Sequence, residues 1–411
     1  MARSKATGNW IGLSLIGIMF LAATAVAAAA TRLWVLTALP AGFLFGFFLQ
    51  KGDLCGASAF SEVILMKDWR KMFGLWVAIV VSMLAFAVGD RMGLVQLAPK
   101  PMLWLNYIVG GAIFGVGSVL AGGCVSGCLY KSATGNLNSI AALLAMPFGI
   151  GLVEYGPLHG WFESMSSKKI AAADGGPVTL SSLTGLSFAT LAVGFAVLTL
   201  AAVAIAWARN KPKKKPAGSQ RAKPPSLKRA LTRPWKPWQA GLAIGALALF
   251  AYVSSDMSGR NYPLGVTHGV LQAQVLLTDT PSKFVYEKAP APPAAAQAAP
   301  KKPAEAQGKK VVWWLVLVVL GMLPGAFIAG ALSGQARLLP KPPEQIVVAA
   351  LGGFMVGAGA ALATGCVIGN IMSGWALMSA GMFLFGIVVI LSNWIATYFY
   401  LMGGGINLGR K

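Results

Sequence analysis

The sequence predicts an all-α integral membrane protein with about ten transmembrane helices plus four short re-entrant helices in two inverted repeats. Three observations support this fold class. Of the 411 residues, 56% are hydrophobic and only 11% are charged, whereas soluble domains carry roughly 25% charged residues. Ten apolar segments are long enough, or nearly so, to cross a bilayer as helices. A block rich in glycine also recurs at a constant offset of 242 residues.

The ten apolar segments are continuously hydrophobic, which excludes the alternating pattern of transmembrane β-strands. Helices are required because lipid offers no partner to backbone N–H and C=O groups. We predict spans near 10–30, 34–50, 71–89, 102–121, 138–156, 180–207, 238–256, 311–333, 346–364 and 374–400. The alternative for the first segment is a cleaved signal peptide. Its length of 21 residues, from Trp10 to Ala30, exceeds the roughly 7–15 usual for the apolar region of such peptides, so we expect a retained helix.

The basic charge is unevenly distributed along the chain. The 34 Lys and Arg and 12 Asp and Glu give a net charge of +22, and 11 of these basic residues lie between Arg209 and Lys236. By the positive-inside rule this loop is cytoplasmic, and counting spans outward places both termini there too. The alternative role for the loop is to dock anionic lipid or an acidic partner. Because so much of the basic charge marks one loop, no nucleic-acid partner is predicted.

The repeated block relates two halves of the chain. Residues 110–127 and 352–369 align without gaps, with glycine, leucine, alanine, cysteine and valine in register. The counted spans run in opposite directions in the two halves, so the repeats are inverted, as in many transporters. The predicted domains are an extra N-terminal helix at 1–33, a first repeat at 34–160, an extra helix at 161–208, a basic cytoplasmic linker at 209–237 and a second repeat at 238–402, with an Ala/Pro-rich insertion at 278–310.

Each repeat contains two segments that are too short to span the bilayer. They lie at 52–66, 123–135, 258–277 and 365–373. Irregular backbone at membrane depth is tolerated only where it is buried in protein or lines an aqueous cavity. We therefore expect re-entrant helices whose N-termini point toward the centre and favour an anion.

All four cysteines fall in these short segments, at Cys55, Cys124, Cys128 and Cys366. Thiols bind soft, polarisable groups and exchange with sulfane sulfur. Cys124 and Cys366 occupy matched repeat positions, which favours a functional role. The repeat position of Cys128 is occupied by Asn370 in the second half, and Cys128 is equally well explained as a small buried hydrophobic residue. Because no Cys-x2-Cys pair occurs, a tetrathiolate zinc site is not predicted, and no metal or cofactor is expected.

Several other residues are auxiliary candidates. Most of the 50 glycines fit small-xxx-small helix packing, but those beside the cysteines suit a backbone that approaches a ligand. His268 is structural by default, with donation to an anion as the alternative. The auxiliary candidates are Cys128, Gly123, Gly127, Gly365, Gly369, Asn370 and His268. No phosphate-loop motif occurs, so the chain is not itself an ATPase, and no catalytic residue is assigned.

These motifs resemble the YeeE/YedE family, the sulfur-transport-domain family of bacterial thiosulfate importers. The resemblance rests on the paired Gly-Cys-x-x-Gly motifs at Gly123 and Gly365, on Gly52-x-x-Cys55-Gly56, and on the stretch from Ser258 to Thr267. Cys128, a two-residue insertion before Pro263 and the 278–310 insertion depart from the family pattern.

The resemblance implies uptake of thiosulfate or a related sulfur anion across the bacterial inner membrane. By motif position, Cys55, Cys124 and Cys366 would relay the sulfur by S–H···S hydrogen bonds, and some relatives work with a small cytosolic sulfur-carrier protein. The expected function is therefore a transporter and not an enzyme. The alternatives are a membrane sulfurtransferase that forms a cysteine persulfide, and a transporter of selenium compounds or soft metals.

Overall fold

A computed structural model describes the chain except residues 1–9, 173–174, 210–226, 279–282, 286–309 and 404–411. The predicted Ala/Pro-rich core of the 278–310 insertion and most of the basic 209–237 linker therefore lie outside the described residues. Ten described stretches are long and apolar enough to cross a membrane. The chain is an all-α integral membrane protein, as the sequence predicted.

The first half of the chain forms seven helices after the N-terminal helix. The N-terminal helix is α2 (Trp10–Thr31), and it is followed by η1 (Trp34–Thr37), α3 (Ala38–Gly52), α4 (Gly56–Met66), α5 (Arg70–Arg91), α6 (Trp104–Leu120), α7 (Val125–Ala133) and α8 (Leu137–Glu154). Between the halves lie α9 (His159–Ser167), α10 (Leu180–Thr184), α11 (Phe188–Arg209) and α12 (Leu227–Thr232).

The second half repeats the same order of long and short helices. It comprises α13 (Pro237–Met257), α14 (Thr267–Thr278), α15 (Trp313–Leu332), α16 (Pro343–Leu362), the π-helical turn η3 (Val367–Met372), α17 (Ser373–Ala376), α18 (Ala380–Ala396) and the π-helical turn η4 (Thr397–Leu401). Two short parallel strands, β1 (Lys283–Val285) and β2 (Lys310–Val312), precede α15. The sequence did not predict this strand pair.

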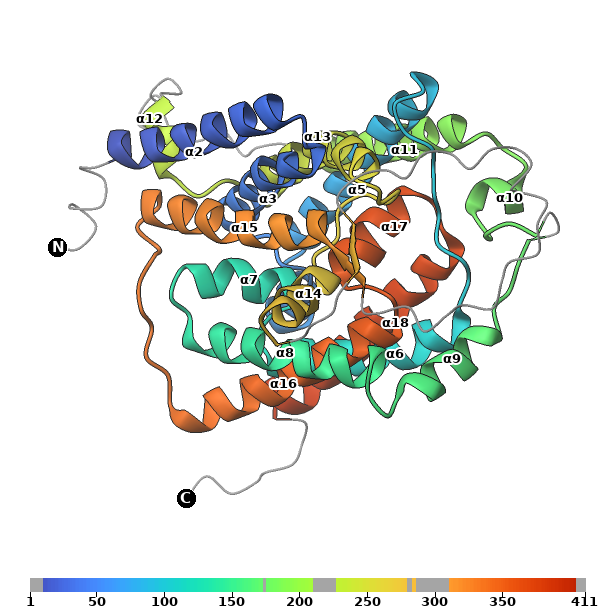
Figure 1. The fold of residues 1–411 in the computed structure, drawn as a ribbon. Coiled ribbons are helices and arrows are strands. Elements are labelled where there is room, and N and C mark those ends of the chain that lie inside the picture. Colours follow the sequence, from blue (N-terminus) through green and yellow to red (C-terminus); the bar gives the residue numbers. More distant parts are fainter. Residues whose placement is uncertain (1–9, 173–174, 210–226, 279–282, 286–309, 404–411) are drawn as a thin grey trace.

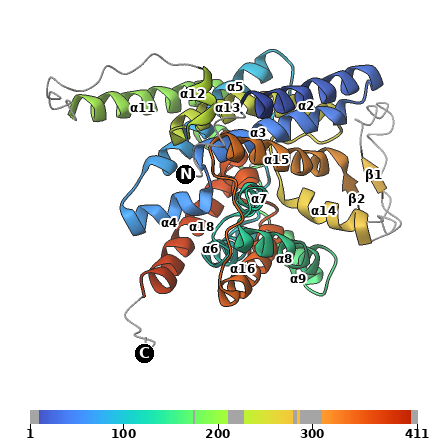
Figure 2. The same ribbon diagram turned by 90° about the vertical axis from the view of Figure 1, so that its left-hand side faces the viewer.

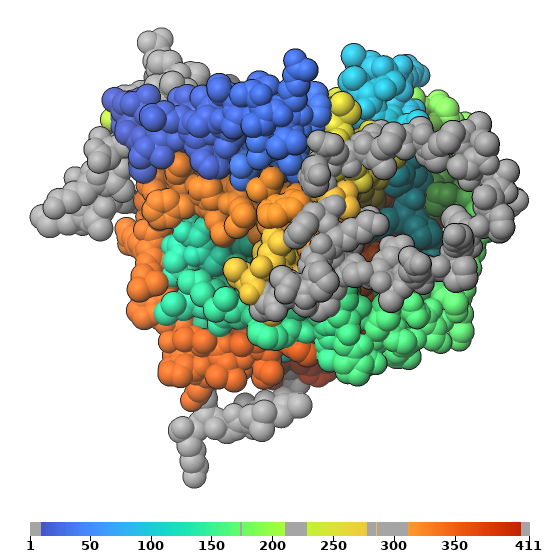
Figure 3. Space-filling view, viewed as in Figure 1, coloured from blue at the N-terminus to red at the C-terminus, as the bar shows by residue number. Residues whose placement is uncertain are grey.

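Long helices pack in two groups with the short helices between them (Figure 1). One group joins α3 to α15 and α13 to α5, and the other joins α8 to α16 and α6 to α16 and α18. The short helix α7 contacts α15 and α8, whereas α14 contacts α15, α8 and α16. On the face shown in Figure 3, segments of α7 and α14 lie between α15 and α16. Helices α7 and α14 therefore lie between the two groups of long helices.

The two helices predicted to stand outside the repeats lie at the periphery. Helix α2 packs on α3 and α15, and α11 packs on α5, so that each covers one side of the same group (Figure 2). Of the ten candidate spans, these two are the least buried. Their apolar surfaces are consequently available to lipid.

Glycines bring the long helices into close contact, as the packing interpretation predicted. A Cβ on Gly46 would collide with the backbone carbonyl of Met322, and one on Gly353 would collide with that of Ala142. Small residues at such crossings increase van der Waals contact between transmembrane helices. Most of the glycines in the long helices therefore serve packing.

Two predicted spans are interrupted. The 180–207 span is divided into α10 and α11 at Gly185, which adopts a left-handed conformation with φ +69° and ends α10. The 374–400 span begins with α17 and restarts as α18 after Met378, a left-handed residue with φ +55°. The apolar composition alone did not reveal either break.

Candidate functional site

Each of the four short helices follows a sharp turn at the end of a long helix. The turns contain a left-handed residue, and these residues are Asp53, Gly122, Gly259 and Thr364. A left-handed residue ends a helix because its conformation cannot continue the backbone ladder. The chain then reverses toward the centre, and the next helix begins within a few residues after three of these turns and at Thr267 after the fourth.

Three of the four short helices begin directly after a cysteine. Cys55 precedes α4, Cys124 precedes α7 and Cys366 precedes η3, each in extended backbone geometry. None of the three side chains caps its own helix by a hydrogen bond. Their thiols are consequently left to contact other groups, beside backbone N–H groups that have no partner within the helix.

The structure brings two of these thiols together. The Sγ atoms of Cys55 and Cys124 lie 3.7 Å apart, and Cys124 Sγ lies 3.3 Å from the Ser126 hydroxyl. A Cβ on Gly127 would collide with Cys55 Sγ and would lie 3.6 Å from Cys124 Sγ. Gly127 is therefore required for the approach of the two thiols, as expected for a glycine at a ligand site.

Cys366 lies beside a more open part of the same centre. A Cβ added to Gly369 would meet no atom within 4 Å, although Gly369 is buried. A Cβ on Gly365 would collide with the side chain of Asn370, which donates to the carbonyls of Ala363 and Gly365 at 2.8 and 2.9 Å. Asn370 thus fixes the turn that carries Cys366.

The remaining auxiliary candidates have structural partners. Cys128 Sγ lies 3.7 Å from the carbonyl of Gly123, and a Cβ on Gly123 would approach Cys128 to 3.3 Å. His268 Nε2 lies 2.9 Å from a carboxylate oxygen of Glu154 and links α14 to α8. All four cysteines are fully buried. Among the described residues, no group of three or more His, Cys, Asp or Glu is placed to hold a metal ion.

A cation that the sequence analysis did not select lies beside Cys366. Lys100 Nζ donates to Asn370 Oδ1 at 2.9 Å and to the carbonyl of Thr364, and it lies 5.0 Å from the ring centroid of Tyr262. Burial, together with the charge of nearby Arg260, lowers the pKa of Lys100 to about 7. The sequence signal was Pro99-Lys100-Pro101, which matches Pro340-Lys341-Pro342 but does not show which lysine is buried.

A second cation, Arg260, lies in the turn before α14. Its guanidinium lies 5.3 Å from the ring of Tyr262 and 5.4 Å from the ring of Trp314. The Tyr262 hydroxyl donates to the carbonyl of Gly369 at 2.7 Å, and so ties this turn to the helix that follows Cys366. Among the described side chains, no carboxylate forms an ion pair with Lys100 or Arg260.

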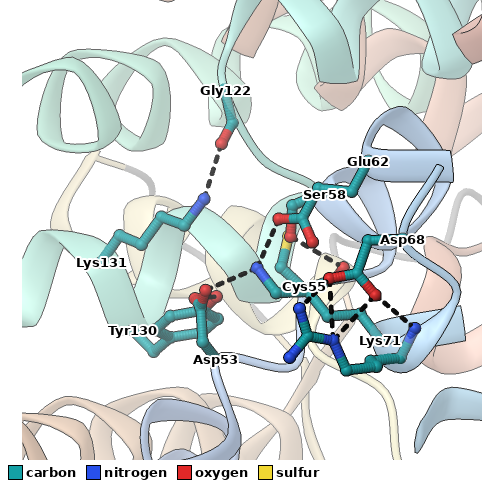
Figure 4. Close-up of polar contacts among 10 residues, drawn as sticks. Asp53, Cys55, Ser58, Glu62, Asp68, Lys71, Gly122, Tyr130 and Lys131 are labelled. Carbon is teal, nitrogen blue, oxygen red and sulfur yellow. Dashed lines mark hydrogen bonds and ion pairs between the residues drawn. The ribbon is translucent and has the colours of Figure 1, made fainter. Parts of the chain in front are cut away.

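Beside Cys55, Asp53, Glu62 and Lys71 form ion pairs, whereas Lys131 has no described carboxylate partner (Figure 4). Lys71 bridges Asp53 and Glu62 at 2.5 and 2.6 Å, and the Tyr130 hydroxyl donates to Asp53 at 2.8 Å. Lys131 donates to the carbonyl of Gly122 at 2.8 Å. This network fastens the turn after α3 to α4, α5 and α7.

The fold and this centre together define a class of protein: a multi-pass membrane protein whose buried centre is formed by helix N-termini and thiols. The family described as sulphur transport matches residues 51–395. The chain belongs to this family, which the resemblance to YeeE/YedE proteins indicated, and it is therefore a transporter and not an enzyme.

Individual relatives cover most of the chain. A protein of Spirochaeta thermophila named thiosulfate transporter TsuA is 31% identical over 369 residues, which is 87% of this chain and 96% of the relative. The Escherichia coli protein of the same name is 27% identical over 368 residues, with 89% and 94% covered. A probable transporter of Escherichia coli, YedE, is 32% identical over 100 residues, 24% of each chain.

Proposed function

We propose that the protein imports thiosulfate or a closely related sulfur anion through a path lined by Cys55, Cys124 and Cys366. The observation that carries the proposal is the position of these thiols, since each directly precedes a short helix at the centre of the bundle. The names of the two long relatives support the substrate.

Each chemical part of thiosulfate has a counterpart in this centre. Its terminal sulfur is soft and polarisable and suits a thiol, whereas its oxygens and charge suit helix N-termini and cations. The 3.7 Å separation of Cys55 and Cys124 allows one sulfur to pass between the two thiols. Because the thiols are fully buried, the path has to open on either side during a transport cycle.

The direction of transport rests on the charge distribution in the sequence. The basic linker at 209–237 places both termini in the cytoplasm by the positive-inside rule, and Cys55 and Cys124 then lie on the cytoplasmic side of Cys366. Location in the bacterial inner membrane, the inverted orientation of the repeats and a cytosolic sulfur-carrier partner are further parts of this proposal.

The test is uptake of labelled thiosulfate by proteoliposomes. We expect the wild-type protein to accumulate label and the Cys124→Ala, Cys366→Ala double variant to lose uptake. Cys128→Ala is the matched control, because this thiol is equally buried but contacts the backbone of Gly123. Full uptake by the double variant would exclude the thiol path.

A mass measurement separates transport from the sulfurtransferase alternative. In that reaction a cysteine thiolate attacks the terminal sulfur, forms a Cys–S–S⁻ persulfide and releases sulfite. A stable adduct of one sulfur atom on a cysteine, with sulfite released, would favour the enzyme. Intact thiosulfate inside the vesicles supports transport. If selenium compounds or soft metal ions compete with thiosulfate for uptake more strongly than other sulfur anions do, the alternative of a transporter for selenium compounds or soft metals is favoured.

A further inference from the structure

The fourth short helix, α14, begins without a thiol. The residue before it is Val266, at the position that cysteines occupy before α4, α7 and η3. The first residue of α14 is Thr267, whose side chain is only 2% exposed. Its hydroxyl oxygen has no hydrogen-bond partner among the described residues. A buried hydroxyl without a partner is costly, so a polar ligand that contacts Thr267 would stabilise this helix start.

The turn before α14 contains Arg260, and only one of its two terminal nitrogens, Nη1, donates a hydrogen bond to the described residues. Arg260 Nη1 donates to the Ser255 hydroxyl at 3.1 Å and to the carbonyls of Tyr262 and Pro263 at 2.9 and 2.6 Å. No hydrogen bond from Nη2 to a described residue is present. A Cβ on Gly265 would lie 2.9 Å from Nη2. The glycine therefore leaves room for Nη2, which has no hydrogen-bond acceptor among the described residues.

The same turn is attached to the segment that carries Cys366. Tyr262 donates to the carbonyl of Gly369 at 2.7 Å, and the Ser373 hydroxyl donates to the carbonyl of Leu264 at 2.9 Å. Lys100 contacts Asn370, and Lys100 and Arg260 lie 5.0 and 5.3 Å from the ring of Tyr262. The start of α14 and the thiol of Cys366 thus belong to one structural unit, beside the open space at Gly369.

We propose that the start of α14 is a subsite for the oxygen atoms of a tetrahedral sulfur oxyanion, with the Thr267 hydroxyl and the Arg260 guanidinium as its donors. This inference rests on the proposed transport of thiosulfate, and it assigns the oxygen end of that anion to α14 and the sulfur end to Cys366. Backbone N–H groups in the first turn of α14 complete the donors for a negative charge.

This division explains why the fourth helix departs from the pattern of the other three. A thiol is a weak hydrogen-bond donor and suits a soft sulfur atom, whereas a hydroxyl and a guanidinium suit hard oxygens. An anion with one sulfur and three oxygens then has a defined orientation in the centre. Sulfide lacks the oxygens and sulfate lacks the terminal sulfur, so each matches only one part of the site.

The test is equilibrium binding of labelled thiosulfate and labelled sulfate to the purified full-length protein. Thr267→Val removes the hydroxyl at nearly constant volume, and we expect affinity for both anions to fall about tenfold, the usual effect of losing one hydrogen bond to a charged group. Thr267→Ser keeps the hydroxyl and should bind close to wild type. The Thr24→Val exchange is the matched control, because Thr24 lies in the peripheral helix α2 and donates to its own helix backbone.

Two further variants distinguish the subsite from a general loss of structure. Gly265→Ala should displace Arg260 Nη2 and lower the affinity for both anions. Cys366→Ala should lower the affinity for thiosulfate and leave the affinity for sulfate unchanged. Wild-type affinity for both anions in Thr267→Val would overturn the subsite. If the wild-type protein binds sulfate in a Thr267-dependent way but does not bind thiosulfate, the proposed function fails and the oxyanion subsite stands. Binding of neither anion by the wild-type protein overturns both.

Discussion

The two Gly-Cys-x-x-Gly segments share a sequence pattern but lie in different surroundings. Cys124 contacts a second thiol at 3.7 Å, and Gly127 leaves space that this second thiol fills. Around Cys366 the corresponding glycine, Gly369, faces open space, and the nearby charged groups are cations. The same motif therefore permits contact between two thiols in one half and leaves open space beside Cys366 in the other.

The charged groups follow the same division. Beside Cys55, the carboxylates of Asp53 and Glu62 neutralise Lys71. Beside Cys366, no described carboxylate pairs with Lys100 or Arg260. The two cations near Cys366, one from each half of the chain, thus have no described ion pair, whereas Lys71 near Cys55 has two.

The largest effect is expected from adding a methyl group to each of the matched glycines. Gly127→Ala should lower the thermal stability of the protein and abolish uptake, because its Cβ collides with Cys55 Sγ and overpacking typically costs about 1–3 kcal/mol. Gly369→Ala should leave stability unchanged and reduce uptake, because it narrows a space that we assign to substrate. The measurements are thermal unfolding in detergent and thiosulfate uptake. Equal stability of both variants would contradict the difference in packing.

The next largest effect concerns the charge beside Cys366. Lys100→Met should weaken thiosulfate uptake by about tenfold, because one charge-assisted contact to the anion is lost. The substitution leaves no carboxylate without its partner but removes the donor to Asn370 Oδ1 and to the Thr364 carbonyl, so thermal unfolding of the variant has to be measured beside uptake. Michaelis kinetics of uptake measure the effect, and a KM unchanged from wild type would remove Lys100 from the site.

A smaller effect is expected from pH, through the same lysine. A lysine is charged below its pKa, and the pKa of Lys100 is lowered to about 7 by burial and by Arg260. Its positive charge is therefore present below about pH 7 and lost above it, so anion affinity should fall as the pH rises through neutrality. Lys100→Arg keeps the charge throughout this range and serves as the control. A wild-type profile that matches the Lys100→Arg profile would exclude titration of Lys100.

The smallest effect is expected in the paired network of the first half. Asp53→Asn removes the ion pair with Lys71, whose partner carboxylate is 54% exposed in its side chain, and exposed pairs contribute at most about 1 kcal/mol. Glu62 remains to pair with Lys71. Denaturation of the variant should therefore resemble wild type, and its substrate affinity should be unchanged. A large loss of affinity would show that anion binding is not confined to the surroundings of Cys366.

Hydrophobicity and the repeat were sufficient to predict most of the architecture. Long continuous apolar segments can cross lipid only as helices. The segments between them could be recognised because they are short and rich in glycine. The cysteines could be placed at the starts of the re-entrant helices because the motif marks a turn. The strand pair had no comparable signal in the sequence. The break at Met378 had none either, because the left-handed conformation of a residue other than glycine depends on its tertiary surroundings.

The charged part of the site was less predictable than its thiols. Lys100 and Lys341 both lie between prolines, yet Lys341 is exposed and Lys100 contacts Asn370. Thr267 and Arg260 were visible only as part of a family-like stretch, because the absence of a hydrogen-bond partner is a property of the packed structure. Sequence patterns selected the thiols as candidate ligands, whereas the proposed oxygen donors could be selected only from the tertiary contacts.

Uptake of labelled thiosulfate by proteoliposomes containing Cys366→Ala, compared with wild type and Cys128→Ala, tests the central claim most directly. Each variant lacks one buried thiol, and of the two substituted cysteines Cys366 directly precedes a short helix whereas Cys128 lies within α7. The account predicts accumulation by wild type and Cys128→Ala and a loss of at least about tenfold in Cys366→Ala. Wild-type uptake by Cys366→Ala would contradict a thiol-lined path for the sulfur anion.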